Sequence, residues 1–188
     1  PEPLAASYPV VAYMHGTALK NAQVPSYPDR CDEALLINTL FASHGYVAVM
    51  PDYIGQGRGT NDSIRHPYLY AATTATTVTD MLKAVNELSA LLPVQLNNKL
   101  FICGLSQGGH ATMAAQRHIE QTPSAQPFRL IASAPCAGPY YLPILWDFWL
   151  ANNHYKAPPL TAHLYLSYKS IYGFSEALGS VFIPPYDG

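Results

Sequence analysis

The chain has 188 residues, of which 49% are hydrophobic and 12% are charged, and its formal net charge is −2. This apolar content excludes a disordered chain and suffices for the core of one domain, or of one domain with an appendage. The ten scattered basic residues argue against a nucleic-acid-binding surface, no apolar stretch approaches the about 18 residues of a membrane span, and three cysteines exclude a disulfide scaffold.

Short apolar runs alternate with helical patterns along the first two thirds of the chain. The predicted order is strand 8–14, helix 36–44, strand 46–50, helix 78–92 with its start near residue 71, strand 99–103, helix 107–122 and strand 128–134. Because these strands are apolar on both faces and separated by helices, they predict a parallel sheet with helices on both faces.

The pattern changes after residue 136. Residues 140–174 hold ten aromatic side chains, and Leu164, Tyr168 and Ile171 keep helical spacing. We therefore divide the chain into an α/β core, residues 1–138, and a helical lid segment, residues 139–188. The lid aromatics either form a small core of their own or line an acyl or alcohol pocket, and both can hold together.

The residues at 104–108 read G-L-S-Q-G, a match to the G-x-S-x-G motif, between a predicted strand and a predicted helix. In this context the motif forms a sharp turn that exposes a nucleophilic serine at the end of the strand. We therefore assign Ser106 as the candidate nucleophile and expect a strained backbone with positive φ there. The alternative is that Ser106 only caps the following helix.

A serine that attacks an acyl group needs N–H donors for the developing oxyanion. One candidate is the backbone N–H of Gln107, directly after the serine. The second comes from the loop after strand 8–14, where Thr17 is our first choice and Gly16 the second. The alternative for this loop is an ordinary glycine turn.

Together, the His-Gly-Thr loop at 15–17, the strand and glycine-rich loop at 46–57, the stretch 66–71 and the motif at 104–110 resemble the α/β-hydrolase superfamily. Within it, they are similar to lid-containing esterases of the secretory-lipase type, over residues 8–140. The resemblance implies a partial α/β-hydrolase fold with a helical lid. It also implies a serine hydrolase that cleaves a small hydrophobic carboxylic ester through an acyl-enzyme, without cofactor or metal.

The resemblance also implies that the acid and histidine of the triad follow two later strands. In this chain Asp147, His154 and His163 occur in a usable order, but all three fall in the predicted lid. We therefore expect the acid and the histidine outside this chain. Both ends of the sequence read as loops, so we expect a piece of a longer polypeptide that a further segment of the same protein completes.

Several other polar residues receive structural interpretations. We expect Asp52 to accept N–H bonds from its own glycine-rich turn and His110 to serve packing on its helix. We also expect Cys103 and Cys136 to be buried thiols, because adjacent strands rarely have the geometry of a disulfide, and Cys31 to be free as well. No cysteine or histidine spacing indicates zinc.

Other functions remain open from the sequence. A serine peptidase or amidase, or an acyltransferase, would use the same nucleophile. A non-catalytic binding module on this fold would keep the sheet without the nucleophile, and the motif at 104–108 counts against it. The low charge, with 14 Tyr and 17 Pro, favours a secreted or periplasmic location.

Overall fold

The computed structural model describes residues 7–60, 63–151 and 158–184. Its strands are β1 (Tyr8–Met14), β2 (Val47–Val49), β3 (Leu96–Leu105) and β4 (Arg129–Cys136). Its α-helices are α1 (Asp32–Phe41), α2 (Ala71–Ser89), α3 (Gln107–Gln121), α4 (Leu142–Ala151) and α5 (Pro158–Tyr172). Four short 3-10 turns are η1 (Pro28–Arg30), η2 (Ala42–His44), η3 (Pro123–Ala125) and η4 (Leu178–Ser180).

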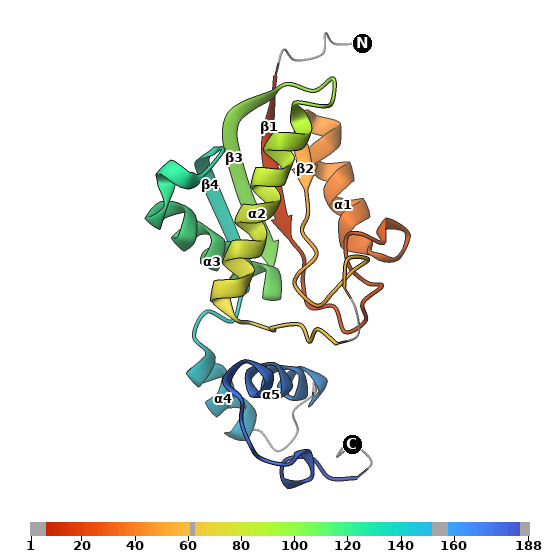
Figure 1. Ribbon diagram of the computed structural model, residues 1–188, viewed down its shortest axis with the longest axis vertical. Helices are drawn as coiled ribbons and strands as arrows, with labels where there is room; N and C mark the ends of the chain where they lie inside the picture. Colours follow the sequence, from red (N-terminus) through yellow and green to blue (C-terminus); the bar gives the residue numbers. More distant parts are fainter. Residues whose placement is uncertain (1–6, 61–62, 152–157, 185–188) are drawn as a thin grey trace.

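The four strands form one parallel sheet in the order β2-β1-β3-β4 (Figure 1). Val11 of β1 pairs with Ala48 on one side and with Phe101 on the other. The predicted alternation of strands and helices is therefore confirmed, and so is the parallel sheet. Gly45, in the left-handed conformation with φ 81°, ends the α1–η2 stretch where the sequence predicts the stop.

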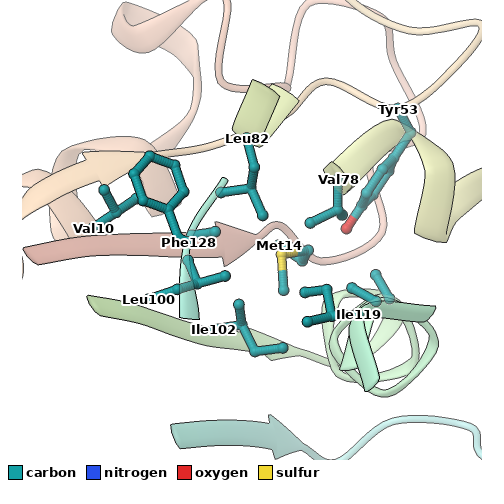
Figure 2. Close-up of a cluster of buried hydrophobic side chains, with 12 residues drawn as sticks. Val10, Met14, Tyr53, Val78, Leu82, Leu100, Ile102, Ile119 and Phe128 are labelled. Carbon is teal, nitrogen blue, oxygen red and sulfur yellow. The ribbon is translucent and has the colours of Figure 1, made fainter. Parts of the chain in front are cut away.

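Helices α2 and α3 cover one face of the sheet, and their side chains meet alternate residues of the central strands. Figure 2 shows this core, in which Met14 and Ile102 of the sheet pack with Val78, Leu82 and Ile119 of the two helices. Helix α1 lies over the opposite face. Tyr13 points to that face, away from the core, and donates its hydroxyl to Glu33 of α1 at 2.8 Å. Helices thus lie on both faces, as predicted.

The start of α3 lies directly against the carboxyl end of β1. A Cβ atom built on Gly108 would stand 1.9 Å from the backbone oxygen of Met14, and one on Gly104 would stand 2.4 Å from the oxygen of Gly108. Neither neighbour is a side chain that could turn aside. Only glycine at these positions lets the helix and the strand approach this closely.

Helices α4 and α5, in the segment predicted to be a lid, lie beyond the carboxyl ends of the strands (Figure 1). Leu164 of α5 packs with Tyr68 and Leu69 of the core, and Leu142, Trp149 and Tyr168 pack around them. The lid aromatics thus contribute in part to a shared cluster with the core. The predicted domain boundary after residue 138 falls in the connection between β4 and α4.

Two expectations are wrong in part. The three cysteines are free, but only Cys31 is buried, Cys103 is half-buried and Cys136 is exposed. Cys136 is exposed because β4 lies at one of the two edges of the described sheet. Asp52 accepts the backbone N–H of Ser26 at 3.0 Å, so it ties two loops together rather than closing its own turn. Across the described ranges, no helix is both long and apolar enough to cross a membrane.

We predict that Gly108→Ala lowers the free energy of unfolding by at least about 2 kcal/mol, because the added methyl group forces the start of α3 away from β1. Chemical denaturation of the two proteins measures the difference. Gly59→Ala is the control, since nothing lies within 4 Å of a Cβ atom at that position. Equal losses in both variants would contradict the close approach.

Candidate active site

Ser106 lies between the end of β3 and the first residue of α3. Its backbone has φ 57° and ψ −117°, and the residue is exposed. Its N–H donates to the carbonyl of Cys136 at 2.9 Å, and its own carbonyl accepts the N–H of His110 at 3.1 Å. A positive φ is strained for a residue with a side chain, so this turn holds the hydroxyl in one place. The backbone conformation expected for Ser106 is therefore present.

The loop after β1 runs beside this turn. A Cβ atom on Gly16 would stand 3.6 Å from the carbonyl oxygen of Leu105, the residue before the serine. The Gly16 N–H, however, donates to both carboxylate oxygens of Glu33, at 2.9 and 3.2 Å. The Gly16 N–H, our second choice of oxyanion donor, thus already has the Glu33 carboxylate as its acceptor. Burial, followed by the bond to Glu33, raises the pKa of Tyr13, whose hydroxyl binds the same carboxylate.

Thr17, the first-choice donor, is half-buried, and its side chain is fixed. Its hydroxyl pairs with the hydroxyl of Tyr68 at 2.9 Å. On either side of it, the carbonyl of His15 accepts the Tyr53 hydroxyl at 2.9 Å and the carbonyl of Ala18 accepts the Gln56 amide at 3.0 Å. Tyr53, Gln56 and Tyr68 therefore hold the loop 15–18 through three hydrogen bonds.

Gln107 has its side chain buried beneath the turn, with 2% of the residue exposed. Its Nε2 lies 2.7 Å from Nε2 of His66, whose Nδ1 lies 2.9 Å from the carbonyl oxygen of Ile54. That carbonyl can only accept, so His66 carries its proton on Nδ1 and accepts the Gln107 amide N–H on Nε2. Burial lowers the pKa of His66 to about 4, which keeps the ring neutral near pH 7.

Aromatic rings continue this network from the loop after β1 to the lid. His15 stacks on Tyr53 with 4.2 Å between ring centroids, and Tyr53 stacks on His66 at 5.6 Å. His163 of α5 lies 5.6 Å from His66 and 4.5 Å from Tyr68. Burial lowers the pKa of His15 and of His163, so the imidazoles of the cluster are neutral together. A charge on His163 or His15 would further disfavour protonation of His66.

The structure does not bring the low-ranked acid and base candidates to Ser106. Asp147 is exposed on α4. His163 faces His66 and Tyr68, with its Nε2 buried and without a partner. His154 lies outside the described residues. Neither Asp147 nor His163 makes a hydrogen bond to Ser106 in the part of the chain that the structure describes.

His110 is half-buried on α3, and burial lowers its pKa, in keeping with a packing role. A search of the described residues for three or more histidine, cysteine or carboxylate side chains placed to hold a metal ion finds none. Sequence reasoning missed Glu33, His66 and Tyr68 as parts of the site. The stretch 66–71 contributed to the resemblance, but nothing in its local pattern indicates which residues it touches.

Comparison with known proteins shows that the chain is similar to solved hydrolases. No family model and no curated protein matches the chain. Among solved structures, the rice cell wall degrading esterase LipA from Xanthomonas oryzae is 32% identical, with a TM-score of 0.86 over 100% of this chain and 49% of its own. A protein from Legionella pneumophila described as a hydrolase is 27% identical, with a TM-score of 0.84 over 98% of this chain and 48% of its own. The chain thus spans about half the length of both.

We predict that the free energy of unfolding falls as the pH drops from about 6.5 towards 4. In this range His66 binds a proton in the unfolded chain but stays neutral in the folded protein, where it is buried. With its pKa lowered to about 4, His66 accounts for about 3 kcal/mol of that loss. His66→Gln should remove this part of the pH dependence, measured by denaturation at each pH. His44→Gln, at an exposed histidine, is the control. An unchanged slope in His66→Gln would show that His66 is not held neutral.

Proposed function

The chain belongs to the α/β-hydrolase superfamily, and on that premise we propose that it carries the nucleophile of a serine hydrolase that cleaves carboxylic esters through an acyl-enzyme. The observation that carries the proposal is the backbone of Ser106, an exposed serine with φ 57° at the junction of β3 and α3. A residue that only capped the helix would have no reason to adopt this strained conformation. The 32% identity to an esterase over the whole of this chain supports the same reaction class.

In the proposed reaction, the hydroxyl oxygen of Ser106 attacks the ester carbonyl carbon and its proton passes to a histidine. The C–O bond to the alcohol then breaks, the histidine returns the proton to the leaving alkoxide, and the acyl group remains on Ser106. Water then attacks the acyl-enzyme in the same way, the histidine takes its proton and passes it to Ser106, and the carboxylic acid is released. The backbone N–H groups of Gln107 and Thr17 hold the oxyanion in both halves. Since the Gly16 N–H is bound to Glu33, Thr17 is the better second donor.

The surroundings of Ser106 support a hydrophobic substrate. Leu105, directly before the serine, is 49% exposed, and the lid carries exposed Ile144 and Phe148 on α4. An ester with an apolar acyl or alcohol group could cover such surface on binding. The solved esterase is described as degrading the rice cell wall, and we propose a secreted or periplasmic location for this protein also.

We further propose that another segment of the same protein pairs with β4 and supplies the acid and the histidine. β4 is the edge strand, and Ile131 on it is 40% exposed. Soluble proteins cover or charge a long apolar edge of this kind. The two solved structures compared above are about twice the length of this chain, which leaves room in such proteins for further strands and catalytic groups.

We predict that Ser106→Ala lowers the rate of ester hydrolysis by the whole protein by at least about 10³-fold, because no other group replaces the nucleophile. Hydrolysis of p-nitrophenyl esters measures the rate, and mass spectrometry after treatment with a fluorophosphonate should find the label on Ser106. Ser124→Ala, at an exposed serine in η3, should leave the rate unchanged. A label on another residue would contradict the assignment.

We predict that residues 1–188 alone are poorly soluble and inactive on p-nitrophenyl esters, whereas the whole protein is soluble and active. The physical reasons are the exposed β4 edge and the lack of a base beside Ser106 among the described residues. Size-exclusion chromatography and an esterase assay on both proteins test this. A soluble, active monomer of the isolated chain would instead favour Asp147 with His154 or His163 as the acid and base.

A further inference from the structure

The two proposed oxyanion donors come from different loops, yet one short segment touches both residues. Nε2 of His66 accepts the side-chain amide of Gln107 at 2.7 Å, and the hydroxyl of Tyr68 pairs with the hydroxyl of Thr17 at 2.9 Å. We infer that residues 66–69 form the scaffold of the oxyanion hole, with His66 and Tyr68 as positioning residues for its two N–H donors. This inference rests on the proposed function.

Burial and a fixed ring orientation stabilise the hydrogen bond between His66 and Gln107. Both residues are nearly fully buried, at 5% and 2% exposed. Nδ1 of His66 is fixed by the carbonyl of Ile54, so the acceptor nitrogen faces only Gln107. The groups packed around the ring are Tyr53, Tyr68 and two other histidines, His15 and His163. None of these carries a charge near neutral pH that would compete for the Gln107 amide.

The second contact sets the loop that carries Thr17. Tyr68 is 4% exposed, and its ring lies against His163 of the lid. Its hydroxyl pairs with the hydroxyl of Thr17, whose Cβ is bonded directly to the backbone that carries the proposed N–H donor. Because catalytic groups must be held within about 0.5 Å of the productive geometry, a contact that fixes the Thr17 side chain also helps to fix its N–H.

The lid fixes the segment from its other side. Ser167 of α5 donates to the carbonyl of Tyr68 at 3.4 Å, and the hydroxyl of Tyr168 donates to the carbonyl of Leu69 at 3.3 Å. Leu69 itself has φ 54°, a strained conformation for leucine. The scaffold therefore lies between the lid and the oxyanion hole, with contacts to each.

Two double-mutant cycles in the whole protein test the inference, with hydrolysis of a p-nitrophenyl ester as the readout. One cycle combines His66→Phe with Gln107→Met, and the other combines Tyr68→Phe with Thr17→Val. Every variant keeps the backbone N–H groups and a side chain of similar shape. We expect each single change to lower kcat about tenfold with little change in KM, because the donors act mainly in the transition state.

Each double variant should be no slower than its slower single variant, because either change breaks the same contact. His66→Gln, which keeps an acceptor near the position of Nε2, should recover most of kcat. This variant also separates positioning from a general loss of packing. Tyr70→Phe is the control, since it removes a hydroxyl from the same stretch and no hydrogen bond from that hydroxyl to a described residue is present.

The inference is overturned if the single variants keep the kcat of the parent protein, or if the effects within a cycle multiply. It is also overturned if His66→Gln is as slow as His66→Phe. Ser106→Ala separates this failure from that of the proposed function. If Ser106→Ala abolishes hydrolysis while the cycles show no loss, only the scaffold is refuted. If Ser106→Ala remains active, the nucleophile assignment and the scaffold fall together.

Discussion

The close approach of bare backbone at the start of α3 to the end of β1 determines the rest of this structure. Gly108 stands where any side chain would collide with the Met14 carbonyl, so helix and strand meet without intervening atoms. This contact places the loop after β1 beside Ser106 and forces the strained turn that exposes its hydroxyl. The strain is tolerated because α3 packs on both α2 and the sheet in the main core.

The carboxyl ends of parallel strands lie together at one end of the sheet, and loops far apart in the sequence meet there to form the site. Hydrogen bonds and stacked rings hold these loops, and among the described residues no ion pair joins them. The carboxylate of Glu33 binds a hydroxyl and a backbone N–H, and buried imidazoles stack on tyrosine rings. The hydroxyl of Tyr13 and the N–H of Gly16 offset the cost of bringing the Glu33 carboxylate into this half-buried place.

The sheet, its helices and the turn at Ser106 could be predicted because each depends on a local pattern: apolar runs, 3.6-residue spacing, or glycines flanking a serine. The contacts of His66 and Tyr68 could not be predicted, since their partners lie 41 and 51 positions away in the sequence and the contacts depend on how loops pack. The same reason explains the errors. Whether Cys136 is buried depends on β4 being an edge, and the partner of Asp52 belongs to a different loop.

The proposed lid and the proposed oxyanion hole both contact the segment 66–69, which links the two in the proposed mechanism. Leu69 is 2% exposed and strained, so its conformation persists only while the cluster around Leu164 and the Tyr168 hydroxyl hold it. If the lid moved away, Leu69 would lose these contacts and could relax. Relaxation would carry Tyr68 with it and loosen Thr17. In the proposed mechanism, packing and these three hydrogen bonds couple the position of the lid to the geometry of the oxyanion hole.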